Sequence, residues 1–403
     1  MVAENQKSEL SKLIKKLRDF ELPKVNMAEL CSPSPSMSWE DFLPELKNLN
    51  AENTGVLPVD IKQETLLIDV RSESEFAESS IPGAVNFPIF DDKERHNVGL
   101  LFKQQSEKLA EQVGAYYAFQ KKEDYLTKIK DAASNKKIVV HCWRGGFRSK
   151  SVTALLNRNG MNAIQLEGGH KTFRKNVHKY LYETPPKLIS LSGQTGTGKS
   201  ELLEAIIENH PEIPVLHLEK AARHASSVFG AARFGWNEVT NQQEFETRLF
   251  MQFLPWIENS QTPIFLTEKE SSQIGKVLIP NGILSELKKE NHIRLTSNIN
   301  TRVKRLLKEY INEEDEETLT TLRTHIGFLK RFLSHEELEN YLALFDKREW
   351  HTLLKKILIE YYDKVYKKCN REPIAEIEHE STSETMNAVI NLYKKQTKME
   401  RFK

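Results

Sequence analysis

Cysteine is scarce in this 403-residue sequence: Cys31, Cys142 and Cys369 lie far apart, with no CxxC or His-Cys spacing. Neither a disulfide framework nor a dedicated metal site is therefore expected, and an important cysteine would act as a free thiol. Long apolar runs are also missing, since no segment reaches the roughly 18 residues needed to cross a bilayer. The N-terminus has acidic residues and no apolar signal core, so we expect a cytoplasmic protein with no membrane partner.

The chain also lacks an excess of one charge. Its 58 Lys and Arg against 57 Asp and Glu give a net charge of +1, which neither indicates nor excludes a nucleic-acid partner. Local basic stretches such as TRVKRLLKEY still permit a basic face. The composition, 39% hydrophobic and 29% charged, is typical of a globular protein, and the length predicts two or three domains.

The order of the expected elements indicates an α/β protein with a parallel sheet at its start. A helical spacing over 8–20 and the CSPSPS stretch form an N-terminal extension and linker, residues 1–36. A capping-box pattern at Ser38 opens the first domain, and strands are expected at 66–70 and 137–141. A helix and the strand NAIQL follow, and strand, helix and strand in series imply a parallel sheet.

A second series of elements begins after the break ETPPK at 183–187. The strand LISLS leads through a glycine-rich loop into a helix, so we expect a first domain over 37–184 and a P-loop NTPase-like α/β domain over 187–403. Beyond about residue 300 the sequence predicts a helical C-terminal subregion. The Leu and Tyr stripe of 353–366 is expected in its core.

One cysteine stands where a nucleophile is expected. In HCWRGGFRS, Cys142 follows a buried strand, Gly145 and Gly146 lie in the loop, and Arg148 begins a helix. Converging backbone N–H groups and the helix N-terminus favour a thiolate over a thiol. Such a thiolate can attack sulfur or selenium in a donor and carry it, while Arg148 and Arg144 steady anions nearby. The loop therefore predicts covalent chalcogen transfer.

Two other interpretations of this loop stay open. Cys142 could be a small apolar residue that closes a strand, although the glycines and arginines would then be unexplained. The loop also fits the tyrosine-phosphatase signature of His-Cys, two residues, Gly, two residues and Arg. No Asp general acid is evident after the loop, which disfavours a phosphatase without excluding one.

A second motif predicts phosphate binding. GQTGTGKS at 193–200 fits Gly, four residues, Gly-Lys-Ser, between a strand and a helix. The glycines let the backbone wrap a diphosphate, Lys199 neutralises its oxygens and the Ser200 hydroxyl suits Mg²⁺. The expected phosphate-binding residues are Gly193, Gln194, Thr195, Gly196, Thr197, Gly198, Lys199 and Ser200. Glu268 and Glu270, at the end of a later strand, are candidate partners of magnesium or water, or else a solvated strand end.

Basic residues interleaved with aromatics indicate where RNA would bind. The stretch ARHASSVFGAARFGW offers Arg223, Arg233 and Trp236, which could grip phosphates and stack bases. The alternative is a solvated loop whose aromatics lie in the core. Arg302 is a weaker candidate, because a helical run of charges is usually a solvated face.

These motifs together carry a family resemblance. Residues 66–173 resemble a rhodanese domain, with LLIDVRSESEF, IPGAVNFP and the Cys142 loop as its signatures. The stretch 38–366 is similar to the bacterial tRNA 2-selenouridine synthase family, in which DDKERHNVGLLFKQQ is a typical insertion, CWRGGFRS the catalytic loop and SGQTGTGKS the Walker loop. The later blocks LEKAARHASSVFG, ESSQIGKVLIP and IEYYDKVY depart from the family pattern. His217 replaces a usual Asp, and Lys269 and Ser272 replace an acid and an arginine.

The resemblance implies a two-step reaction on the wobble 2-thiouridine of a tRNA anticodon loop. Geranyl diphosphate would alkylate the sulfur, and selenium from selenophosphate would then replace the geranylated sulfur. It implies that the P-loop binds geranyl diphosphate with Mg²⁺ and that Cys142 carries selenium; a selenophosphate-producing enzyme is a candidate partner. The rival classes are a sulfurtransferase or phosphatase fused to a nucleotide-hydrolysing P-loop regulator, and a non-catalytic RNA-binding scaffold.

Overall fold

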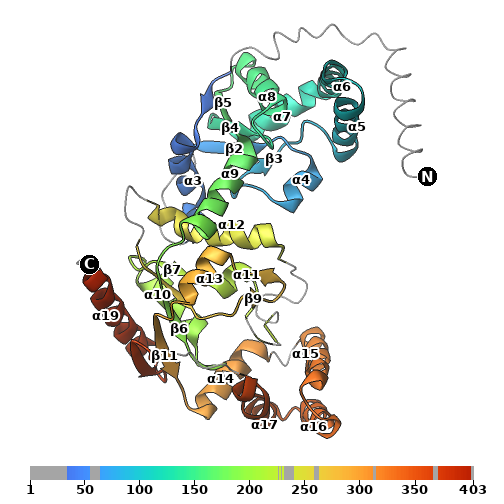
Figure 1. The fold of residues 1–403 in the computed structure, drawn as a ribbon. Coiled ribbons are helices and arrows are strands. Elements are labelled where there is room, and N and C mark those ends of the chain that lie inside the picture. Colours follow the sequence, from blue (N-terminus) through green and yellow to red (C-terminus); the bar gives the residue numbers. More distant parts are fainter. Residues whose placement is uncertain are drawn as a thin grey trace. The chain divides into compact units, whose positions relative to one another are not determined.

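The computed structural model describes residues 34–54, 64–225, 227, 229–230, 240–257, 263–311, 315–365 and 371–400. The chain divides into two compact units, Met1–Asn176 and Val177–Lys403 (Figure 1). Among the described helices, none is both long enough and apolar enough to cross a membrane. The helix predicted over 8–20 lies outside the described residues.

A five-stranded parallel sheet forms the centre of the first unit, in the order β1-β5-β4-β2-β3. Its strands are β1 (Ser36–Met37), β2 (Thr65–Asp69), β3 (Val85–Asn86), β4 (Lys137–His141) and β5 (Ala163–Leu166). All residues of β2 and the last four of β4 are buried, as expected for parallel strands covered on both faces. The predicted parallel sheet is confirmed, and the strand over 137–141 has the predicted bounds.

Seven helices are described around this sheet. They are α3 (Trp39–Thr54), α4 (Glu73–Glu78), α5 (Asp92–Gln104), α6 (Glu107–Gln120), α7 (Lys122–Ala133), α8 (Phe147–Arg158) and α9 (Gly169–His178). Helix α5 begins in the insertion noted above, where the Asp91 side chain accepts a hydrogen bond from the Glu94 N–H to close a capping box. Ile68, Val140 and Val152 belong to one apolar core that joins the sheet to its helices.

The second unit contains another parallel five-stranded sheet, in the order β12-β11-β6-β8-β7. Its strands are β6 (Leu188–Ser192), β7 (Val215–Leu216), β8 (Phe265–Glu268), β11 (His292–Thr296) and β12 (Ala375–Glu378); β9 (Gln273–Ile274) and β10 (Val277–Leu278) form a separate antiparallel pair. Strand β6 is central, and the strands that follow it lie on both of its sides. Its carboxyl end is therefore the place where such sheets bind ligands.

Helices cover this second sheet and extend beyond it. They are α10 (Lys199–Asn209), α11 (Leu218–Ala222), α12 (Gln242–Phe253), α13 (Asn281–Leu287), α14 (Ile299–Tyr310), α15 (Glu316–Phe328), α16 (His335–Asp346), α17 (Trp350–Lys356), α18 (Asp363–Val365) and α19 (Thr382–Glu400). Shorter turns of other helix types are η1 (Lys179–Glu183), η3 (Leu254–Trp256), η4 (Leu329–Arg331) and η5 (Ile357–Tyr362).

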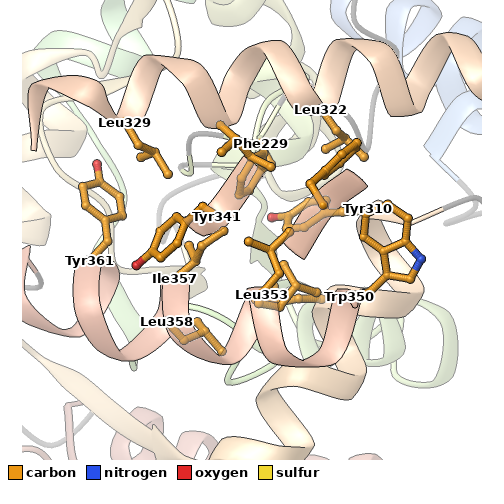
Figure 2. Packing of buried hydrophobic residues seen from close by; sticks show 14 of the residues in the cluster. Phe229, Tyr310, Leu322, Leu329, Tyr341, Trp350, Leu353, Ile357, Leu358 and Tyr361 are labelled. Carbon is orange, nitrogen blue, oxygen red and sulfur yellow. The ribbon is translucent and has the colours of Figure 1, made fainter. Parts of the chain in front are cut away.

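The predicted helical C-terminal subregion has its own core (Figure 2). Leu353, Ile357 and Leu358 pack there with aromatic side chains such as Tyr341 and Trp350, so the apolar stripe over the described residues from 353 is core, as predicted. The chain then returns to the sheet, which was not predicted. Strand β12 pairs with β11, and α19 contributes Val389, Ile390 and Tyr393 to the core of the sheet.

Candidate functional sites

Cys142 lies at the carboxyl end of β4, in the loop that leads into α8. Its side chain is buried, with 3% of its surface exposed. Helix α9 holds this loop through two backbone hydrogen bonds. The His170 N–H donates to the Cys142 carbonyl at 2.9 Å, and the Lys171 N–H donates to the Trp143 carbonyl at 2.8 Å. The predicted strand, loop and helix around the sulfur are all present.

The nearest hydrogen-bonding side chain to the sulfur is one that the sequence analysis did not select. The Ser149 hydroxyl lies 3.2 Å from the Cys142 Sγ. The Gln165 amide donates to the Ser149 oxygen at 2.7 Å and to the Gly145 carbonyl at the same distance. Because Gln165 donates a hydrogen bond to the Ser149 oxygen, the Ser149 hydroxyl is left to act as a donor. The Gly146 carbonyl and the sulfur both lie 3.2 Å away, and donation to the sulfur would stabilise a thiolate.

Two glycine loops press together below Cys142. Gly145 has a φ of +64°, and a Cβ at this position would lie 2.7 Å from the Gly168 nitrogen. A larger residue would therefore push the cysteine loop away from the start of α9. This close packing explains Gly145 in HCWRGGFRS, whereas a Cβ at Gly146 would have no atom of the described residues within 4 Å.

The two arginines of the loop differ in their surroundings. Arg148 donates to the Glu75 carboxylate at 2.8 and 3.4 Å, so its charge is balanced within the unit. Burial alone would lower the Arg148 pKa and raise the Glu75 pKa, but their mutual hydrogen bond and charge reverse both shifts. Arg144 is exposed at the loop surface. Arg144 is therefore more accessible to an approaching anion than Arg148.

The P-loop joins the carboxyl end of β6 to α10, as predicted. Lys199 folds back over the loop and donates to the Gly193 carbonyl at 3.0 Å. Gly198 has a φ of +82°, and a Cβ there would lie 2.8 Å from the His379 ring. The predicted phosphate-binding residues thus form one continuous turn at the N-terminus of an eleven-residue helix, which is a favourable place for an anion.

Side chains from distant parts of the sequence hold this loop from behind. The buried Arg302 donates to the Thr195 carbonyl at 2.8 Å and pairs with Asp363 at 2.7 Å. Arg305 donates to the Thr197 carbonyl at 3.3 Å, and the His379 Nδ1–H donates to the same oxygen at 2.8 Å. Arg302 is predicted above as an RNA contact, but its side chain is 4% exposed and its guanidinium is bonded within this unit.

An acidic cluster with one histidine adjoins the start of α10. The Ser200 hydroxyl donates to Glu219 at 2.5 Å. The Glu219 N–H donates to Glu268 at 2.6 Å, and the His217 Nδ1 lies 2.9 Å from the same Glu268 oxygen. Glu268 is fully buried and receives both bonds on its Oε1, while its Oε2 has no hydrogen-bond partner within the described part of the chain; Glu219 is the carboxylate beside the predicted magnesium ligand Ser200. Glu270 is half-buried two residues beyond the end of β8.

His217 is a cation inside this cluster. Burial alone would lower its pKa, but Glu268, Glu204 and Glu219 outweigh that effect and raise the pKa of His217 to about 9. Its Nε2 lies 3.7 Å from the Glu204 carboxylate. The protonated ring donates through Nδ1 to Glu268, because the competing Lys220 N–H is 3.4 Å away. His217 thus brings a positive charge to the position at which the family pattern described above usually has an Asp.

The elevated pKa of His217 predicts a pH-dependent stability. A group whose pKa rises on folding stabilises the fold fully below its unfolded pKa of about 6.5, and this contribution is lost as the pH rises through about 9. The contribution is on the order of 2 kcal/mol, or about 5 °C in the melting temperature. Thermal unfolding in EDTA between pH 7 and 10 measures it. His217→Gln should remove this part of the pH dependence and His210→Gln should keep it; identical profiles for wild type and His217→Gln would contradict the prediction.

The remaining predicted RNA contacts are only partly described. Arg223 is exposed in a left-handed turn that ends α11. Arg233 and Trp236 lie outside the described residues.

Two family models match the two parts of the chain that hold the candidate sites. Residues 186–399 match the model of the tRNA 2-selenouridine synthase AAA domain, and residues 57–176 match the rhodanese-like domain. The chain belongs to the tRNA 2-selenouridine synthase family. The predicted family and the rhodanese-like plus P-loop architecture are thereby confirmed.

Three curated relatives are each called tRNA 2-selenouridine synthase. The Nitrosomonas europaea protein is 32% identical over 62% of this chain and 64% of its own length. The Hydrogenovibrio crunogenus protein is 28% identical over 74% and 88%. The Bordetella bronchiseptica protein is 30% identical over 74% and 87%. This chain therefore spans just under two thirds of the first relative and most of the other two.

Proposed function

We propose that this protein is a transferase that converts the wobble 2-thiouridine of tRNA to 2-selenouridine by way of S-geranyl-2-thiouridine. The observation that supports this most strongly is the pairing of a rhodanese-type cysteine loop with a P-loop in one chain of this family. One site suits covalent chalcogen chemistry and the other suits a diphosphate. We infer that the reaction takes place in the cytoplasm, with a selenophosphate-producing enzyme as the donor's source.

We assign selenium transfer to Cys142. Its thiolate would attack the selenium of selenophosphate, so that an S–Se bond forms as the Se–P bond breaks and phosphite leaves with the electron pair. The selanyl group would then attack C2 of the geranylated base and expel geranyl thiolate, and a thiol would cleave the S–Se bond to release 2-selenouridine. The Ser149 hydroxyl at 3.2 Å would stabilise the sulfur anion, and the exposed Arg144 would attract the donor's phosphate. Release of selenium from sulfur consumes electrons, so the reaction requires an added thiol as reductant.

We assign geranyl transfer to the P-loop. Charge accumulates on the diphosphate as the allylic carbon departs, and Lys199 with the backbone N–H groups of 193–200 would stabilise that charge. The residues present fit a magnesium ion, since Ser200 and Glu219 meet at 2.5 Å beside the loop. Among the described residues, no group of three or more His, Cys, Asp or Glu side chains could hold a metal ion, so we expect most of its ligands to be diphosphate oxygens and water. Bound there, Mg²⁺ would supply further positive charge to the leaving group.

The test of the whole proposal is mass spectrometry of the wobble nucleoside. Purified protein is incubated with 2-thiouridine tRNA, geranyl diphosphate, Mg²⁺, selenophosphate and a thiol. The geranylated base is expected when selenophosphate is omitted, and 2-selenouridine when every component is present. An unmodified base in both reactions would overturn the proposal, and ATP or GTP hydrolysis without RNA modification would favour the nucleotide-regulated sulfurtransferase instead.

The contacts of Arg302 allow a test of whether this residue supports the phosphate-binding loop or binds RNA. Arg302→Met removes the donor to Thr195 and leaves Asp363 without its partner, so the phosphate loop loses its rear support. We expect inorganic diphosphate to bind about 10-fold more weakly, with unchanged binding of an anticodon stem-loop. Isothermal titration calorimetry measures both ligands, and Asp363→Asn should act in the same direction. Weaker RNA binding with normal diphosphate binding would return Arg302 to the RNA interface.

A further inference from the structure

The residue after the nucleophile has an unusual environment. Trp143 follows Cys142 directly, and 38% of its surface is exposed. Its indole stacks on the His170 ring with centroids 5.2 Å apart and an interplanar angle of 29°. The Arg71 guanidinium lies 5.9 Å from the Trp143 ring centre. Two buried groups, His170 and Arg71, thus lie against the ring, while 38% of the Trp143 surface stays exposed.

The two groups that lie against the Trp143 ring are themselves held by hydrogen bonds. His170 is fully buried, its N–H is bonded to the Cys142 carbonyl, and its Nε2 lies 3.3 Å from the Ser79 hydroxyl. Arg71 is held by Asp69 at 2.6 Å and by the Ser79 carbonyl at 2.6 Å. Burial, with the charges of Arg71 and of nearby basic groups, lowers the pKa of His170 to about 2, so its ring stays neutral at physiological pH.

We propose that Trp143 binds the wobble base of the tRNA by stacking and positions its C2 atom for the group carried on Cys142. The inference rests on the function proposed above and adds a residue to its selenium-transfer site. A base must leave its own stack before chemistry can occur on it, and an aromatic surface next to the reacting sulfur replaces the stacking that it loses. The uracil ring and the indole are both planar and uncharged. They can therefore stack on each other without a charged group beside Trp143.

Other exposed aromatics in the first unit provide a matched control. Phe102 on α5 and Phe119 on α6 are 58% and 54% exposed, on helices that do not carry the cysteine loop. A general contribution of surface aromatics to RNA binding would make their removal as harmful as that of Trp143. The proposal predicts that it is not.

The experiment measures two reactions of the full-length protein. The first is the appearance of selenium on Cys142 after addition of selenophosphate, followed by intact-protein mass spectrometry. The second is the formation of 2-selenouridine from geranylated tRNA, from which KM and kcat are obtained. The variants are Trp143→Ala, Trp143→Leu, Trp143→Phe and, as a control, Phe119→Ala. A tRNA with 5-bromouridine at the wobble position adds a photocrosslink that peptide mass spectrometry can locate.

We expect Trp143→Ala and Trp143→Leu to raise KM about 10-fold or more, because stacking on an aromatic side chain is lost. Trp143→Phe should restore most of the affinity, Phe119→Ala should match wild type, and all four variants should acquire selenium on Cys142 at the wild-type rate. The crosslink should map to Trp143. Recovery by leucine would indicate a contact to the geranyl chain and overturn the proposal, as would a normal KM in Trp143→Ala or slower selenium loading as the only defect. A wild-type protein that makes no 2-selenouridine would instead refute the underlying function.

Discussion

Replacing Cys142 by serine is expected to stop selenium transfer and to leave the geranylated base as the final product. A serine hydroxyl is almost never ionised near neutral pH, so the variant lacks the nucleophile that holds selenium. We expect the rate of 2-selenouridine formation to fall by at least about a thousandfold. The side chain is 3% exposed and serine is slightly smaller, so the fold should persist. Mass spectrometry of the wobble nucleoside measures both products.

Ser149→Ala is the matched control for this change. It removes the hydroxyl that lies 3.2 Å from the sulfur but keeps the cysteine. Because a hydrogen bond to a charged group contributes about 1.5 to 3 kcal/mol, we expect a loss of only about 10- to 100-fold. Full 2-selenouridine formation by Cys142→Ser would show that Cys142 is a packed core residue, the other interpretation of this loop. Hydrolysis of a phosphate ester by wild type would support the phosphatase interpretation.

The sequence predicted most of the fold because its signals are local. The apolar run KIVVH and the alternation of strands with helices need no knowledge of distant residues, and both predict the parallel sheets correctly. Strand β12 was missed because AEIE alternates apolar and charged residues over only four positions, after a long helical stretch. Its pairing with β11 joins residues more than 80 positions apart, which no local pattern reveals.

The candidate sites, like the fold, were predictable only where their signals are local in the sequence. Cys142 and the loop 193–200 are contiguous motifs and could be selected directly. Arg302 and His379, in contrast, reach Thr195 and Thr197 from 107 and 182 residues away. The charge run around Arg302 suggested a solvated or RNA-binding face, and only its bond to the Thr195 carbonyl and its pair with Asp363 indicate support of the loop. Glu268 was selected for its place at a strand end, which is correct, but its bond to His217 depends on a contact across 51 positions.

Replacing Lys199 by alanine is expected to block the reaction at its first step. The ammonium group is the fixed positive charge of the loop 193–200, and without it the departing diphosphate loses a direct counter-charge. Its present bond to the Gly193 carbonyl is a contact that a diphosphate can replace, since a phosphate oxygen is the stronger acceptor. We expect geranylation to slow by about a hundredfold or more. The measurement is the yield of geranylated base from 2-thiouridine tRNA.

The control for Lys199 is Lys269→Ala, which also removes a lysine near a strand end of the same sheet. The Lys269 ammonium donates to the Leu287 carbonyl at the end of α13, so it supports the fold and not the phosphate loop. The Lys269→Ala variant should therefore retain geranylation activity. Supplying tRNA that is already geranylated should restore 2-selenouridine formation to Lys199→Ala, because Cys142 lies in the other unit and needs no diphosphate. Failure of this rescue would mean that the P-loop also serves the selenium step, and the assignment of one step to each site would have to be abandoned.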